Sequence, residues 1–166
     1  MQASFEDTKV YPWKGLAGVM LHGGVGFCRR VWDYGLCMLG MNTKDTGNLG
    51  ESIACEFLMQ KGFTIKERNY RKPWGEIDII AEKGGIVRFV EVKSVSYKMI
   101  DVFSRETDGY RPEERVDSRK LEKISRTAET YMAEKHLDQD RQIDVVAVFL
   151  DPSTRKAVCT LYEGVV

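Results

Sequence analysis

The spacing of hydrophobic residues predicts two amphipathic helices. The first begins with Asn48 as its N-cap, because Glu51 follows three residues later at the spacing of a capping box, and it ends at Gly62. The second begins at Asp117 or Ser118, either of which can cap a helix. The apolar faces are Leu49, Ile53 and Phe57 in the first helix, and Leu121, Ile124, Ala128 and Tyr131 in the second.

Shorter apolar or alternating runs predict the strands of a sheet. Gly84-Gly85 is a strong two-residue hairpin turn, and residues 71–75 are expected to be a loop. The predicted strands are residues 63–70, the two arms of a hairpin over 75–93, residues 143–150 and residues 156–162. The order α-β-β-β-α-β-β indicates an α/β fold with a mixed central sheet flanked by helices.

Composition indicates one globular domain without a strong overall charge. The chain has 166 residues, 43% of them hydrophobic, and its 25 Lys and Arg balance 25 Asp and Glu. Bulk charge therefore gives no sign of a nucleic-acid partner. Residues 1–40 lack a clear period and motif. We predict that they are an N-terminal extension, an upstream addition or a mis-assigned start, and that residues 41–166 form the domain.

The sequence indicates a cytoplasmic protein that does not associate with a membrane. The apolar residues 15–28 are fewer than the roughly 20 that a bilayer span needs, and Glu6 and Asp7 do not fit the basic start of a secretory signal. The cysteines are scattered without the spacing of a zinc site. We therefore expect reduced thiols, with Cys55 and Cys159 in the core or at an edge.

Charged residues inside the hairpin are the main candidates for chemistry. If the turn is Gly84-Gly85, Asp78 lies directly opposite Glu91, and Glu76 lies opposite Lys93. Directly opposed side chains have Cβ atoms about 4.5–5.5 Å apart, and like charges there are destabilising. Two carboxylates at that separation need a proton or a cation between them.

A divalent metal ion would satisfy this requirement. Mg²⁺ binds oxygen ligands and keeps several waters, and Mn²⁺ is an alternative. We hypothesise that Asp78 and Glu91 hold the ion, and that Lys93 orients the attacking water or stabilises the growing negative charge. The alternative is a solvated sheet face with a Glu76–Lys93 ion pair and two tolerated acids.

The motifs together resemble a known group of nucleases. "GEIDII" followed by "FVEVK" resembles the PD-(D/E)xK nuclease core, with Ile77 in place of the proline. "GNLGESIACEFLMQKGFTIKERNYR", "GEIDIIA", "FVEVK" and "IDVVAV" together are similar to the YraN-like family over residues 47–150. That family has a restriction-endonuclease-like fold and is similar to Holliday-junction resolvases.

The resemblance implies roles for the residues of the hairpin and the first helix. Asp78 and Glu91 would be metal ligands, the Val92 carbonyl a third ligand, and Lys93 the catalytic lysine. Glu51 would complete the acidic cluster, although its place in a capping box explains it equally well.

Basic and aromatic residues outside the hairpin are candidates for contact with nucleic acid. Arg71 and Trp74 are suited to grip a backbone and stack on a base, or else they serve packing. Arg119 and Lys123 lie on the polar face of the second helix, which is alternatively a solvated face. Val95 stands where the family usually has a basic residue, which weakens the expectation of phosphate contact there.

The expected function is hydrolysis of DNA phosphodiesters by a metal-dependent endonuclease, with branched or damaged DNA among its substrates. Mg²⁺, or Mn²⁺ in its place, is the expected cofactor, DNA is the expected partner, and a homodimer is left open. The alternative is a non-catalytic nucleic-acid-binding module of the same fold. The neutral charge and Val95 favour the alternative, whereas Asp78, Glu91 and Lys93 favour catalysis.

Overall fold

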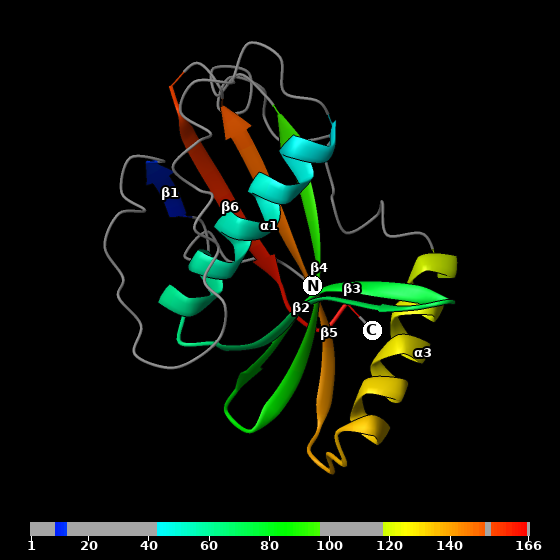
Figure 1. Cartoon of the computed structure of the whole chain (residues 1–166). Helices are drawn as coiled ribbons and strands as arrows, with labels where there is room; N and C mark the ends of the chain where they lie inside the picture. The colour runs from blue at the N-terminus through cyan, green and yellow to red at the C-terminus, as the bar shows by residue number, and fades with distance from the viewer. Residues whose placement is uncertain (1–8, 13–42, 97–117, 152–153, 166) are drawn as a thin grey trace.

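A mixed sheet forms the centre of the molecule, as Figure 1 shows for this computed structural model. The described residues are 9–12, 43–96, 118–151 and 154–165. The strand order among them is β1-β6-β5-β4-β3-β2, and only β4 and β5 are parallel. The elements are β1 (Lys9–Pro12), α1 (Thr43–Gln60), β2 (Thr64–Lys72), β3 (Gly75–Lys83), β4 (Ile86–Ser96), α3 (Ser118–Glu134), β5 (Arg141–Asp151) and β6 (Lys156–Tyr162). The predicted α/β class is confirmed.

The two helices cover opposite faces of the sheet. The apolar side of α1 packs with Ile79 and Val90 in one buried cluster, and the apolar side of α3 packs with Ile80 and Phe89 in a second cluster. This division follows from the period of two along a strand. The expected apolar faces of both helices are confirmed, since Leu49, Ile53 and Phe57 are buried in α1, and Ile124, Ala128 and Tyr131 in α3, with Leu121 packed against the second cluster.

The sheet is forked between β3 and β4. The two strands pair from Lys83 and Ile86 at the turn up to Ile79 and Val90, at the predicted register. Beyond that point β3 pairs only with β2, and β4 continues beside β5 as far as Ser96. In Figure 1 the two strands diverge from their shared segment. The positive φ angles of Gly84 and Gly85, 62° and 79°, fit the predicted hairpin turn.

The predicted start of the first helix was wrong. Helix α1 begins at Thr43, so Asn48 lies inside it and its carbonyl accepts a hydrogen bond from the Ser52 hydroxyl at 3.0 Å. Gly50 is buried against β4, where an added Cβ would lie 2.4 Å from the Ser94 Cβ. This close packing on the sheet outweighs the local capping pattern. Glu51 is therefore not part of a capping box.

The predicted end of the helix is confirmed. Gly62 has a φ of 84°, and its N–H donates to the Met59 carbonyl at 3.0 Å. The Phe63 N–H donates to the Leu58 carbonyl at 3.0 Å, which completes a Schellman motif.

Several strand limits differ from the prediction. Strand β2 continues to Lys72, and only Pro73 and Trp74 form the turn, so most of the predicted loop 71–75 is strand. Strand β1 pairs with β6 and was not predicted, because four residues carry too little periodicity. The rest of 1–40, most of the polar stretch 94–116 and Asp117 lie outside the described residues. No helix in the described part of the chain is long and apolar enough to span a membrane.

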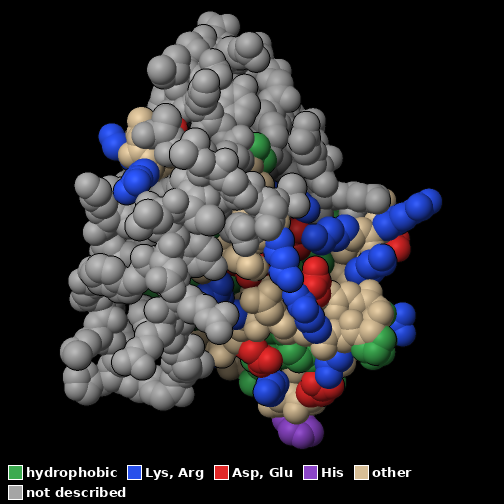
Figure 2. Space-filling view, turned by 45° about the horizontal axis from the view of Figure 1, so that its top comes forward, with side chains coloured by type: hydrophobic (Ala, Val, Ile, Leu, Met, Phe, Trp, Pro, Cys, Tyr) green, Lys and Arg blue, Asp and Glu red, His purple; other side chains and the backbone are tan. Residues whose placement is uncertain are grey.

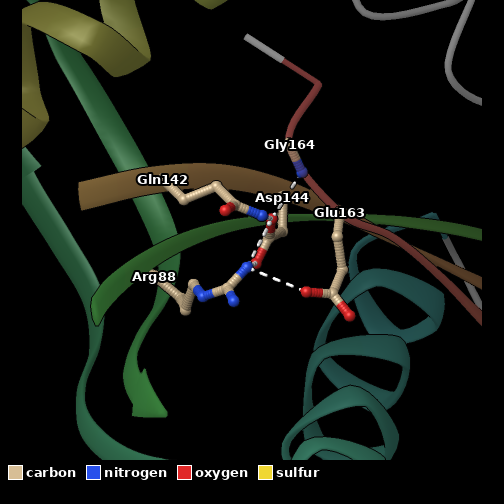
Figure 3. A network of polar contacts seen from close by, with 5 residues as sticks. All are labelled: Arg88, Gln142, Asp144, Glu163 and Gly164. Atoms are coloured by element: carbon tan, nitrogen blue, oxygen red, sulfur yellow. Dashed lines mark hydrogen bonds and ion pairs between the residues drawn. The ribbon is translucent and has the colours of Figure 1, made fainter. Parts of the chain in front are cut away.

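A buried polar network joins β4, β5 and the segment after β6. The Asp144 carboxylate is fully buried and accepts from Arg88 Nη1 at 3.2 Å and from the Gly164 N–H at 2.9 Å (Figure 3). Gln142 donates to the same carboxylate at 2.7 Å, and Glu163 accepts from Arg88 at 3.0 Å. Burial raises the pKa of Asp144, although these donors oppose the rise.

The two described cysteines are free and buried, as predicted. Cys55 lies on α1 and Cys159 on β6, both in the cluster beneath α1. Burial raises the pKa of Cys55 to about 11 and that of Cys159 to about 12. Both thiols are therefore protonated core residues at neutral pH.

Candidate active site

Asp78 lies at the point where β3 leaves β4. The ladder between the strands ends one pair before Asp78, and the Val92 N–H donates instead to Asp78 Oδ2 at 2.8 Å. Ile77 packs in the α3 cluster and Ile79 in the α1 cluster, although they are two residues apart. The period of two is therefore broken at Asp78, and the prediction that Asp78 would be directly paired with Glu91 was wrong.

The Glu91 carboxylate is the most buried charged group of the site. Its side chain is 2% exposed, and Oε1 forms ion pairs with two ammonium groups. One belongs to Lys93, with Nζ at 2.9 Å, and the other to Lys120 on α3. The second oxygen, Oε2, is buried and has no hydrogen-bond partner among the described residues. An unsatisfied buried carboxylate oxygen is costly, so this atom is an open ligand position.

The electrostatics of the site favour a proton on Asp78. Burial raises its pKa to about 7, the nearby charge of Glu91 adds to the rise, and the Val92 N–H and Lys120 oppose it. Burial alone would lower the pKa of Lys120, but its hydrogen bond to Glu91 and the charges of Glu91 and Asp78 raise it. Asp78 and Glu91 are thus close enough for their charges to interact strongly, as the sequence predicted.

Glu51 approaches the site from α1. Its Oε2 accepts from Asn69 Nδ2 at 3.1 Å and lies 3.7 Å from Arg68 Nη2, both on β2. Asn69 lies between Arg68 and Tyr70, which pair with the residues on either side of Asp78, and it has a φ of 53°, which asparagine tolerates better than most residues. The charge of Glu51 also contributes to the raised pKa of Asp78. The structure therefore brings Glu51 near the cluster but holds it toward β2.

The residues fit a divalent cation in part. Within the described ranges, no three side chains of the Asp, Glu, His and Cys types converge closely enough to hold a metal ion. The ligands on offer are the carboxylates of Asp78 and Glu91 and the Val92 carbonyl. The orphaned Glu91 Oε2 and the mutual repulsion of the two acids suit a cation, and oxygen ligands of this kind suit Mg²⁺.

Glu76 lies outside this cluster. Its carboxylate is 3.3 Å from Arg71 Nε on β2, and the two residues pair in the sheet. The expected position opposite Lys93 was wrong, because β3 has already separated from β4 there. Arg71 has a 71% exposed side chain and remains accessible beside Glu76.

The proposed nucleic-acid contacts occupy the β2–β3 turn and the adjacent face of α3. The Arg126 guanidinium lies 4.7 Å from the centre of the Trp74 ring, so Arg126 covers one face of that ring. Gly75 packs closely on the Lys123 backbone, which joins the turn to the helix. Arg119 and Lys123 are exposed. The right-hand part of Figure 2 shows Lys and Arg side chains around acidic ones.

The comparison with known proteins gives the family. A model of Uncharacterised protein family UPF0102 matches residues 50–148. The chain belongs to the UPF0102 family. A UPF0102 protein of Dictyoglomus turgidum is 41% identical over 113 residues, which are 68% of this chain and 88% of that protein. A UPF0102 protein of Campylobacter jejuni (strain 81-176) is 39% identical over 110 residues, 66% of this chain and 88% of that protein.

The UPF0102 family is the YraN-type group with a restriction-endonuclease-like fold, so the predicted resemblance is confirmed. The part of the chain that matches the UPF0102 family model contains Glu51, Asp78, Glu91, Lys93 and Lys120. It therefore includes every side chain of the fork described above. Strand β1 precedes the matched residues and is outside this comparison.

Lys120 is the residue of the site that the sequence did not reveal. It was one of several basic residues on the polar face of the second helix, and nothing in its spacing separated it from Lys123. Its contact with Glu91 depends on how α3 packs over β3. Asn69 was missed for the same reason, since its contact with Glu51 joins β2 to α1.

Proposed function

We propose that this protein is a metal-dependent endonuclease that hydrolyses DNA phosphodiesters at the fork between β3 and β4. The observation that carries the proposal is the convergence of Asp78, Glu91 and Lys93, with a buried Glu91 oxygen that has no hydrogen-bond partner in the described part of the chain. The fold of the UPF0102 family and the PD-(D/E)xK-like motif support the same conclusion. DNA with branches or damage is the proposed substrate class.

The residues of the fork have distinct proposed roles. Asp78, Glu91 and the Val92 carbonyl would hold Mg²⁺ or Mn²⁺, and Glu51 adds negative charge from the side of β2. A cation held there would supply Lewis-acid chemistry, which would polarise a phosphoryl oxygen and lower the pKa of a water. Lys93 orients the attacking water and stabilises the charge that develops on the phosphate.

The binding of DNA would rest on the basic residues next to the fork. Arg119 and Lys123 on α3 and Arg71 at the end of β2 offer charge to a phosphate backbone. Arg126 covers one face of the Trp74 ring, so that face is not open to a base. We therefore assign Trp74 and Arg126 together to backbone contact rather than to base stacking.

Cleavage assays with labelled linear duplexes and four-way junctions test the proposal. We expect wild-type protein to cleave in Mg²⁺ or Mn²⁺ but not in EDTA. Lys93→Ala should lower the cleavage rate by on the order of 10²–10³, the range found when one group that stabilises developing charge is removed. Its DNA affinity should change little, because one lysine supplies a small part of the backbone charge.

Lys66→Ala is the matched control, since Lys66 is a half-exposed lysine of β2 that pairs with Glu82 at 2.7 Å, away from the fork. It should cleave like the wild type. Equal cleavage by Lys93→Ala and wild type would remove Lys93 from the mechanism. DNA binding by wild-type protein without cleavage of any substrate would instead establish the non-catalytic binding module.

A further inference from the structure

Glu91 is shared by two ammonium groups that come from different elements. Lys93 follows Glu91 by two residues on β4, so the same strand fixes both side chains. Lys120 reaches the same oxygen from the first turn of α3. The two cations face the charge of Glu91, and that of Asp78 when it is ionised, before any metal ion is present.

A divalent cation at this site would add two positive charges beside two ammonium groups. Within a half-buried site such like charges interact strongly, because water screens them less than at the surface. One of the ammonium groups must therefore withdraw, or the affinity for the ion must fall.

Lys120 is the ammonium group that can withdraw. Its side chain is 37% exposed, against 28% for Lys93, and it is not tied to Glu91 by a shared strand. Release of Lys120 would leave Lys93 on Glu91 Oε1 and would remove one of the two ammonium groups that contact this oxygen. A long, flexible lysine stem also allows the head to turn toward solvent or an anion.

We propose that Lys120 is a resident counter-cation of Glu91, which a divalent metal ion displaces when it binds. Lys120 therefore competes with the metal ion and sets the affinity of the site from α3. The inference rests on the proposed metal site, and it does not require that the site cleave DNA.

Metal binding to the full chain tests this competition directly. The dissociation constants for Mg²⁺ and Mn²⁺ would be measured by isothermal titration calorimetry for wild type, Lys120→Met and Lys123→Met. We expect Lys120→Met to bind either ion about tenfold more tightly. The substitution removes the charge-assisted hydrogen bond from Lys120 to Glu91 and also removes a positive charge beside the ion, and both losses favour metal binding. Lys123→Met removes an equal charge one turn further along α3 and should stay within about twofold of wild type.

The inference is overturned if Lys120→Met binds the ions as wild type does or more weakly, or if Lys123→Met tightens binding equally. If Lys120→Met does not fold, lysine acetylation of the wild type followed by mass spectrometry decides. Acetylation of Lys120 should rise at least about threefold on adding Mg²⁺ if the ion releases it, and an unchanged rate overturns the inference.

The two proposals can fail separately. Tighter metal binding by Lys120→Met, together with no DNA cleavage by the wild type, would contradict only the nuclease. Metal-dependent cleavage with equal metal affinity in wild type and Lys120→Met would contradict only the displacement of Lys120.

Discussion

Replacing Asp78 by asparagine should make the metal-free protein more stable, increasingly so as the pH rises. Burial and the charge of Glu91 raise the pKa of Asp78 from 3.8 to about 7. Below about pH 4 the group is protonated in both the folded and the unfolded chain, so it costs nothing. Between 3.8 and about 7 only the unfolded chain ionises freely, and stability falls as the pH rises. Above about 7 the full cost is present.

The size of the effect follows from the same two pKa values. A rise from 3.8 to about 7, at about 1.4 kcal/mol for each pKa unit, gives an upper limit of about 4 kcal/mol. Asparagine has nearly the same shape, and its side-chain oxygen still accepts from the Val92 N–H. We therefore expect Asp78→Asn to gain between about 1 and 4 kcal/mol over the wild type at pH 8, and little at pH 4.

Urea unfolding in EDTA at pH 4 to 8 measures this difference. Glu122→Gln, which removes a negative charge from the exposed face of α3, controls for the loss of one charge. Repeating the series with Mg²⁺ should stabilise the wild type by mass action and Asp78→Asn much less. A difference that does not change with pH, or an asparagine variant less stable than wild type at pH 8, would refute the reasoning.

Two further substitutions, followed by urea unfolding, test the packing of α1 on β4 and the buried network around Asp144. Gly50→Ala should cost about 1–3 kcal/mol of stability, because its Cβ would lie 2.4 Å from the Ser94 Cβ. Gly47→Ala is the control on the same helix: its Cβ meets none of the described atoms within 4 Å, so it should gain up to about 1 kcal/mol. Equal effects would contradict the close approach of α1 to β4. Arg88→Met should cost about 3–5 kcal/mol by leaving the buried Asp144 without its cation; a loss below about 1 kcal/mol would show that the other donors suffice.

The hairpin was predictable as far as local rules determine it. Gly84-Gly85 sets the turn, and the turn sets the register up to Ile79 and Val90. The register fails at Asp78 because that carboxylate bonds to the Val92 N–H. Sequence periodicity assumes that a ladder continues, and it gives no sign of where two strands separate.

Residues whose position depends on tertiary packing were the ones missed. The capping pattern at Asn48 was plausible locally, yet the helix extends to Thr43 while Gly50 packs against β4. Lys120 looked like any solvated lysine of an amphipathic helix until α3 was placed on the sheet. The acids and the lysine of the hairpin were predicted correctly as neighbours because they lie on two strands that are joined by one short turn. Their proximity therefore follows from the local sequence and needs no knowledge of tertiary packing.

The fork gives the far end of the hairpin a mechanical part in the site. The backbone ladder between β3 and β4 runs from Ile79 and Val90 to the turn, and Asp78 and Glu91 lie just where the strands part. Beyond that segment β3 is held by its pairing with β2, and β4 by its pairing with β5. A small change in twist near Gly84 would therefore be transmitted as a change in the gap between the two carboxylates. The separation of the two acids is thus linked to the twist of the hairpin whose strands carry them.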